Sequence, residues 1–168
     1  DTLDWLESLI HQDVAERANK KHISEIAYGG GYKLAMSLWD SLLDGLDIMR
    51  RTQGVGIILL AHTAIRKHQD PTADSYDRYQ PALHETASAL LQEWCDEVLF
   101  ASYRVYTRKE DQGFNKERTI ATGASERYLR CIETPAALAK NRLNMPSEID
   151  FSWAAYAQHV VGSSDAKG

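Results

Sequence analysis

The chain of 168 residues is 43% hydrophobic and 26% charged, which is typical of one globular domain with a substantial core. A net charge of -5 excludes a general electrostatic attraction to nucleic acid or anionic membranes and leaves only local basic patches for such contacts. Two distant cysteines favour a reducing cytosol over a disulfide scaffold, and the lack of a long apolar stretch or signal peptide predicts no membrane partner.

The first residues predict the end of a strand that enters a helix. Apolar residues recur at helical spacing from Leu3 to Ile10, and a polar, charged stretch follows. The chain starts at Asp1 without a methionine, and no apolar strand precedes it. We therefore interpret the chain as a fragment or processed piece, truncated at its N-terminus, whose upstream part matters for function.

Three successive glycines at residues 29–31 predict a mobile loop, because glycine disfavours a helix. The loop does not fit a phosphate-binding loop, which needs a glycine, four residues and then Gly-Lys-Ser/Thr. One interpretation is that its backbone and Lys33 contact a ligand, with Tyr28 and Tyr32 as stacking surfaces. The other interpretation is a flexible surface connection.

The clearest predicted helix covers residues 34–51 and leads into an apolar run at residues 54–63. Its core-facing stripe consists of Leu34, Leu38, Leu42, Leu46 and Met49, widened by Trp39 and Leu43. The unbroken apolar run predicts a strand covered on both faces, with residues 57–60 central in a parallel sheet flanked by helices. His62 follows this run, where open α/β sheets gather ligands. His62 is therefore either a working side chain or a polar residue that closes the strand.

Residues 64–81 are polar and predict a long irregular segment, which is often functional or disordered after a buried strand. Its cations suit contacts with phosphates, and its tyrosines suit stacking on bases. Three aspartates offset much of the charge, so a solvated loop is the alternative. The cations are Arg66, Lys67, His68 and Arg78, and the tyrosines are Tyr76 and Tyr79.

The later elements follow from apolar periodicity and turn residues. Helices are expected at residues 82–95 and 151–160, and strands at residues 97–106, 118–122 and 127–133. The last two strands should pair with each other through the connection at residues 123–125. A charged turn around Gly113 should precede them, and the tail from Gly162 should be disordered.

Lys140 and Arg142 lie one residue apart, between Pro135 and Pro146. On an extended chain this spacing puts both cations on one side, where they can clamp a phosphate group. The alternative is an exposed basic turn.

Taken together, these stretches resemble phage-encoded AAA-type ATPases with a RecA-like core, of the recombination or single-strand-annealing type. The resemblance extends from residue 1 to about residue 156. It rests on Asp-Thr-Leu-Asp-Trp-Leu-Glu at the start, Gly-Ile-Ile-Leu-Leu-Ala-His-Thr from Gly56, Asp-Arg-Tyr from Asp77, Leu-Gln-Glu-Trp-Cys-Asp-Glu-Val-Leu-Phe-Ala from Leu91, and Ala-Lys-Asn-Arg from Ala139.

The resemblance implies an α/β fold, in which a mostly parallel sheet flanked by helices carries a C-terminal antiparallel hairpin. Residues 1–160 would form a partial RecA-like P-loop NTPase core, and residues 161–168 a disordered tail. The Walker A loop and the catalytic glutamate of such cores are missing from the chain, and Glu7 does not match that glutamate.

The resemblance also implies roles for individual residues. Asp1 looks like the acid that ends the Walker B strand and positions Mg²⁺ through its water shell. His62 is similar to the polar residue that senses the γ-phosphate, and Lys140 and Arg142 to the finger that reaches a neighbouring subunit's nucleotide. The DNA-facing positions would be Gly29, Gly30, Gly31, Tyr32, Lys33, Arg66, Lys67 and Arg78.

The function implied for the full-length parent is hydrolysis of ATP with Mg²⁺ at subunit interfaces. The hydrolysis would control binding of single-stranded DNA by a ring or filament of identical subunits, in the cytoplasm of a phage's bacterial host. The alternatives are a non-hydrolysing module that binds or anneals single strands, and an inactive truncated remnant.

Overall fold

The computed structural model describes residues 2–111 and 117–162, and its contacts divide the chain into two compact units. Unit 1 comprises Asp1–Arg66 and Tyr79–Glu93. Unit 2 comprises Lys67–Arg78 and Trp94–Gly168. Helices and strands are both present, so the mixed α/β character expected from the sequence is confirmed, whereas the mostly parallel sheet is not.

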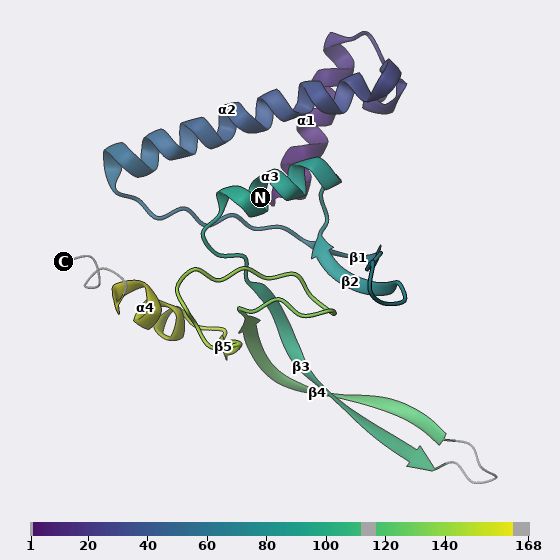
Figure 1. Cartoon of the computed structure of the whole chain (residues 1–168), viewed down its shortest axis with the longest axis vertical. Helices are drawn as coiled ribbons and strands as arrows, with labels where there is room; N and C mark the ends of the chain where they lie inside the picture. Colours follow the sequence, from purple (N-terminus) through teal and green to yellow (C-terminus); the bar gives the residue numbers. More distant parts are fainter. Residues whose placement is uncertain (1, 112–116, 163–168) are drawn as a thin grey trace. The chain divides into compact units, whose positions relative to one another are not determined.

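Unit 1 is built on three helices: α1 (Leu3–Arg17), α2 (Gly30–Gln53) and α3 (Glu85–Trp94). Helix α1 packs across α2 (Figure 1), and two 3₁₀ turns, η1 (Ile23–Glu25) and η2 (Ala27–Gly29), connect them. The buried apolar side chains of the unit are Ile10, Val14, Ala15, Ile23, Ala35, Trp39, Leu43, Leu83, Ala87 and Leu91.

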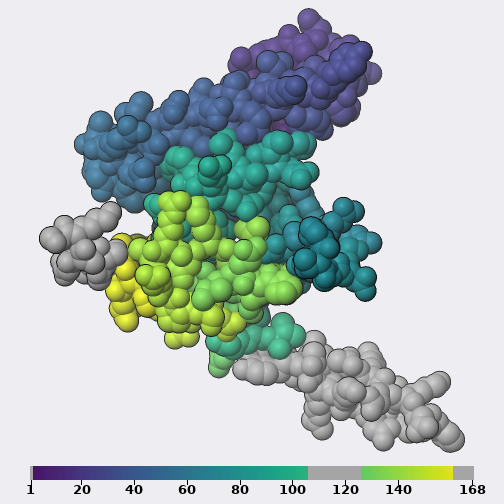
Figure 2. All heavy atoms as spheres, in the orientation of Figure 1, coloured from purple at the N-terminus to yellow at the C-terminus, as the bar shows by residue number. Residues whose placement is uncertain are grey.

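The buried side of α2 differs from the predicted leucine stripe. Trp39 and Leu43 are buried as expected, but Leu34 and Met49 are exposed, and Ala35 takes a core position instead. Many atoms of α2 lie at the surface in the space-filling view (Figure 2). The stripe was identified by residue type, whereas burial depends on the direction in which α1 crosses the helix.

The glycines expected in a mobile loop instead begin helix α2 at Gly30. Tyr28 and Gly29 have positive φ angles of 56° and 65°, and they turn the chain into the helix. Gly31 is buried against η1: a Cβ atom there would lie 2.6 Å from both Cγ1 and the carbonyl oxygen of Ile23. The loop prediction is therefore wrong from Gly30 onward, because the missing side chain at Gly31 serves close packing.

Residues 54–62, expected to form the central strand, are neither helix nor strand. Ile58 and Leu60 are 71% and 64% exposed. A strand buried on both faces needs a paired strand at each edge, and the sheets formed by the described residues include no strand from this segment. The strand predicted at residues 57–60 is therefore not formed here.

The segment expected to be irregular after residue 63 instead contains two strands, β1 (Thr63–His68) and β2 (Tyr76–Pro81), which pair in a two-stranded sheet. The loop prediction is wrong for these residues. Backbone pairing satisfies their polar groups even though few of their side chains are apolar.

Unit 2 contains a three-stranded sheet in the order β3 (Phe100–Asp111), β4 (Glu117–Arg130), β5 (Glu148–Asp150), followed by helix α4 (Trp153–Gly162). Both pairings are antiparallel. The core consists of Cys131, Met145 and Ile149, with Leu99, Leu129, Leu143, Ala155 and Tyr156 packed against it. None of the described sheets shows the parallel pairing that a RecA-like core would have.

The predicted pair of strands at residues 118–122 and 127–133 is a single strand, β4, which pairs with β3. Gly123 does not form a turn but lies opposite Val105, next to a shift in register. The charged turn around Gly113 and the tail beyond Gly162 lie outside the described residues. Among the described helices, none combines the length and apolar character needed to cross a bilayer.

Candidate functional site

The end of the apolar segment meets the beginning of α1 within unit 1. The backbone N–H of Leu3 donates to the carbonyl of Leu60 at 2.8 Å. The backbone N–H of His62 donates to Oδ1 of Asp4 at 3.1 Å, and Nδ1 of its ring lies 2.9 Å from Oδ2 of Asp4. Thr2 Oγ1 lies 3.4 Å from the same nitrogen. These contacts place His62 beside the residues that directly follow Asp1, which itself lies outside the described residues.

The Asp4 carboxylate orients the His62 ring. The hydrogen bond from the His62 side chain holds the pKa of Asp4 well below its usual range, with smaller contributions from Thr2 and the His62 backbone. The carboxylate is therefore ionised at neutral pH and can only accept hydrogen bonds, so Nδ1 carries the proton. The imidazole is 65% exposed, and its Nε2 remains the ring nitrogen available to meet a ligand.

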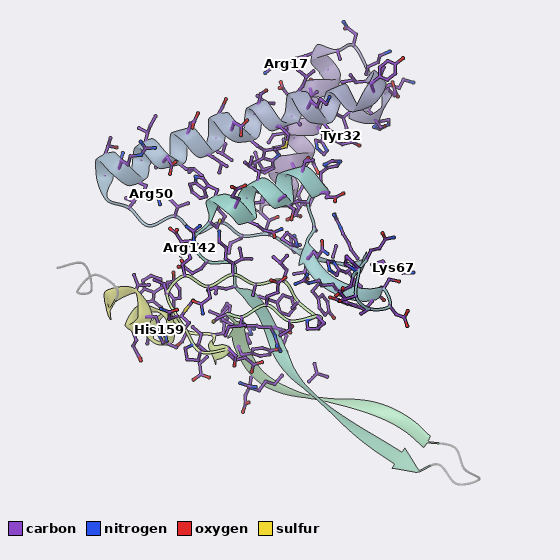
Figure 3. All side chains as sticks on the ribbon, viewed as in Figure 1. Arg17, Tyr32, Arg50, Lys67, Arg142 and His159 are labelled. Atoms are coloured by element: carbon purple, nitrogen blue, oxygen red, sulfur yellow. The ribbon has the colours of Figure 1, made fainter. Side chains whose placement is uncertain are left out.

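A second polar cluster of unit 1 lies where α3 begins. Glu7 is buried, and its two carboxylate oxygens accept from the backbone N–H of His84 at 3.0 and 2.8 Å. The ring of Tyr32 (labelled in Figure 3) stacks on the His84 ring with 4.2 Å between centroids, and the His11 and Tyr32 rings meet edge-on at 5.6 Å. Tyr32, predicted to be a stacking surface for a ligand, stacks on a histidine of its own unit in this structure.

Burial lowers the pKa of His11, the nearby His84 lowers it further, and the charge of Glu7 acts in the opposite direction. The His11 ring is therefore neutral at pH 7. Although two histidines and a glutamate gather here, no three His, Cys, Asp or Glu side chains in the described parts of the chain are arranged to hold a metal ion.

The cations predicted to face DNA divide into two groups. Arg66 donates to the backbone carbonyl of Leu83, and Arg78 is buried and paired with Glu133. Lys33 and Lys67 are exposed (Lys67 is labelled in Figure 3). The two arginines stabilise the fold where they lie, so the lysines are the better placed to contact a phosphate.

Lys140 and Arg142 have different partners within unit 2. Nζ of Lys140 donates to the carbonyl of Cys95 at 2.6 Å, and the Lys140 backbone exchanges two hydrogen bonds with Val98, each 2.9 Å long. Arg142 (labelled in Figure 3) is exposed and pairs with Asp96 at 2.8 Å. Lys140 therefore stabilises the fold, whereas the weak surface pair leaves Arg142 able to move to another partner.

A carboxylic acid lies close to this pair. Burial raises the pKa of Glu97, and the neighbouring charge of Asp96 raises it further, while a hydrogen bond from Tyr156 and the charges of Arg142 and Lys140 oppose the shift. Burial likewise raises the pKa of the Cys95 thiol. A thiol held in its neutral form is a poorer nucleophile than a thiolate.

Sequence reasoning missed four residues that organise these clusters: Asp4, Glu7, His84 and Asp96. Asp4 and Glu7 lie three residues apart in a helix, a spacing that puts both carboxylates on one side and was available as a signal. His84 and Asp96 carried no such signal, because their partners are distant in the sequence.

Comparison with known proteins places the chain in a family. A family model described as an AAA domain matches residues 1–143, a range that includes His62, Lys140 and Arg142. No curated protein matches the chain. No solved structure matches it either. Because the match covers most of the 168 residues, the chain belongs to the AAA-domain family, whose P-loop ATPase-like members have nucleotide-dependent activities.

Proposed function

We propose that this chain is the γ-phosphate-sensing and DNA-facing part of a RecA-like ATPase of phage DNA recombination or replication. ATP bound at subunit interfaces would control its binding of single-stranded DNA. The observation that carries the proposal is the attachment of His62 to Asp4 in a chain that matches an AAA domain over residues 1–143.

The hydrogen bond from Leu3 to Leu60 supports a RecA-like arrangement of strands. In a parallel sheet the carboxyl ends of neighbouring strands meet at one edge, and ligands bind beyond that edge. A strand paired with residues 54–60 would complete this arrangement. The exposed Ile58 and Leu60 support this proposal, because apolar side chains in such a run are normally covered.

The residues of this chain could contact the Mg²⁺ ion and the terminal phosphate of a nucleotide, but they do not include a phosphate-binding loop. No Gly-x-x-x-x-Gly-Lys-Ser/Thr motif occurs in the 168 residues, so the backbone cradle for the phosphates would have to come from residues outside this chain. Asp1 would hold Mg²⁺ through water, and Nε2 of His62 would face the terminal phosphate. A bound Mg²⁺ ion would neutralise negative charge on the phosphate oxygens.

Of the two predicted cations, Arg142 is better suited than Lys140 to contact the phosphates of a neighbouring subunit's nucleotide. Its guanidinium can contact two phosphate oxygens at once, and its present partner is an exposed carboxylate. In a ring or filament of identical subunits it would leave Asp96 to reach a neighbouring subunit's nucleotide. Lys33 and Lys67 would contact single-stranded DNA through its phosphates.

The proposal can be tested by mixing two variants of the protein expressed from the whole open reading frame. Arg142→Ala should bind ATP and lose most hydrolysis, since fingers of this kind contribute about 10³–10⁵ in rate in the well-studied GTPases. Asp1→Asn should lose hydrolysis at its own site but still provide Arg142. Mixed assemblies should regain part of the activity. Wild-type hydrolysis by Arg142→Ala, or no recovery although subunits exchange, would contradict a finger that acts between subunits.

A non-hydrolysing module that binds or anneals single strands is the second candidate, and the exposed Lys33 and Lys67 favour it. The same preparation distinguishes the two candidates. Salt-dependent binding of a labelled oligonucleotide without any ATP hydrolysis would support the module and reject the ATPase.

A further inference from the structure

Both ends of the β1–β2 hairpin are attached to one helix. His62 directly precedes β1, which starts at Thr63, and it is bonded to Asp4 of α1. His84 follows shortly after β2, which ends at Pro81, and it is bonded to Glu7 of α1. The backbone N–H of Ala82 also donates to the carbonyl of His62 at 2.9 Å, so the two ends are joined to each other.

The attachment through Glu7 has the features of a specific contact. Its side chain is only 8% exposed in total, and burial of a carboxylate is costly unless its oxygens are hydrogen-bonded. Both oxygens accept from the His84 backbone N–H at the beginning of α3, where the helix dipole also favours a negative charge. This N–H is one of those that the helix itself cannot satisfy.

The residues around His84 hold it from other directions. Tyr32 stacks on its ring, and Thr86 Oγ1 lies 2.9 Å from its Nδ1. The preceding Leu83 is fully buried, and its carbonyl accepts a hydrogen bond from Arg66 of β1. The second end of the hairpin is thus fixed to α1 by Glu7 and to α2 by Tyr32.

We propose that Glu7 is a positioning residue that couples the beginning of α1 to the β1–β2 hairpin. With Asp4 it forms a two-point attachment, so that a displacement at the start of α1 moves both ends of the hairpin together. This inference rests on the proposed function. There, α1 starts shortly after Asp1, the residue assigned to Mg²⁺, and the hairpin presents Lys67 to DNA. Without Glu7, the second end of the hairpin is released while the first end remains bound to Asp4.

Hydrogen exchange tests the attachment without relying on any activity. Glu7→Gln removes the charge and one acceptor oxygen. In the full-length protein it should accelerate exchange about tenfold at the amide of His84 and severalfold in β1 and β2, with exchange in α2 unchanged. The control is Glu16→Gln, which removes an exposed carboxylate from the same helix. Unchanged exchange in the hairpin would overturn the attachment.

The coupling is tested by the ratio of ATP hydrolysis rates with and without a single-stranded oligonucleotide. Glu7→Gln should keep the rate without DNA within about twofold and bring the ratio close to one, whereas Glu16→Gln should keep the wild-type ratio. A wild-type ratio in Glu7→Gln would overturn the coupling. Absence of hydrolysis in the wild-type protein would reject the proposed function instead, and hydrogen exchange would still decide whether Glu7 holds the hairpin.

A milder variant guards against loss of the fold. If Glu7→Gln also accelerates exchange in α2, the same two measurements apply to Glu7→Asp, which keeps the charge but withdraws the carboxylate by one methylene group. A partial loss of both hairpin protection and stimulation by DNA is expected. Full retention of both in this folded variant would contradict the proposal.

Discussion

His62 and Asp4 are 58 residues apart in the sequence, and two hydrogen bonds join them, one through the His62 backbone and one through its ring. One carboxylate therefore fixes both the course of the chain and the orientation of the imidazole. A side chain oriented in this way by its own unit can present the same nitrogen to a ligand each time one binds.

The first prediction concerns the titration of Asp4. Its lowered pKa contributes stability that is fully present above the ordinary aspartate pKa of about 3.9 and is lost as the pH falls toward the folded-state value. His62→Ala removes the largest cause, so the pKa of Asp4 measured by carbon NMR should rise toward its ordinary range. Asp70, whose pKa is lowered by hydrogen bonds from Thr72, provides an internal control and should not change. An unchanged Asp4 pKa would show that the ring contact is not made in solution.

The second prediction concerns the glycines of α2. Gly31→Ala should reduce the free energy of unfolding by about 1–3 kcal/mol, because the new methyl group would meet the backbone oxygen of Ile23 at 2.6 Å. Gly45→Ala, in the same helix and with no atom within 4 Å of the new Cβ, should increase that free energy by about 0.5–1 kcal/mol. Urea unfolding of both variants measures the difference. Equal effects would mean that Gly31 does not lie against η1.

The third prediction separates Lys140 from Arg142. Lys140→Met keeps the apolar stem but removes the hydrogen bond to the Cys95 carbonyl, and should reduce the free energy of unfolding by about 0.5–1.5 kcal/mol. Arg142→Ala removes only an exposed ion pair and should change it by less than about 0.5 kcal/mol. Denaturant titration checks both values, and a larger loss for Arg142→Ala would assign it a structural role as well.

The fourth prediction compares two cations near the hairpin. Lys67→Ala should leave the stability unchanged and reduce the log–log salt dependence of single-strand binding by about 0.7, the value for one phosphate contact. Arg78→Met should instead cost about 1–2 kcal/mol of stability, because it removes the buried guanidinium and leaves the half-exposed Glu133 without this partner. Oligonucleotide titrations across salt concentrations separate the effects. A reduced slope in a fully stable Arg78→Met variant would make Arg78 a DNA contact.

The sequence predicts the helices of this fold better than its strands. Helices α2, α3 and α4 overlap their predicted ranges, because a helix satisfies its backbone within one segment and its apolar period is local. The apolar run at residues 57–60 shows the limit of such reasoning. Apolar side chains favour a strand only where a partner strand is available, and whether one is available depends on residues elsewhere in the chain.

The candidate site was predictable in part. The position of His62 after an apolar run marked it as a candidate, but its contact with Asp4 depends on tertiary structure. The predicted pairing of Lys140 with Arg142 on one side assumed an extended chain. In the structure a backbone bridge joins Lys140 to Val98 and Arg142 pairs with Asp96, while the charges of both cations act on Glu97.

The edge of β3 limits how another chain can add to this sheet. Among the described strands, β3 pairs only with β4, so no described strand covers its other edge, and such edges recruit a further strand in aggregates. The register shift between Tyr103 and Val105 is a bulge in the partner strand, since β4 advances four residues there while β3 advances two. Because a bulge bends the strand pair and increases its twist, β3 is a less suitable partner for a straight incoming strand than a regular strand would be.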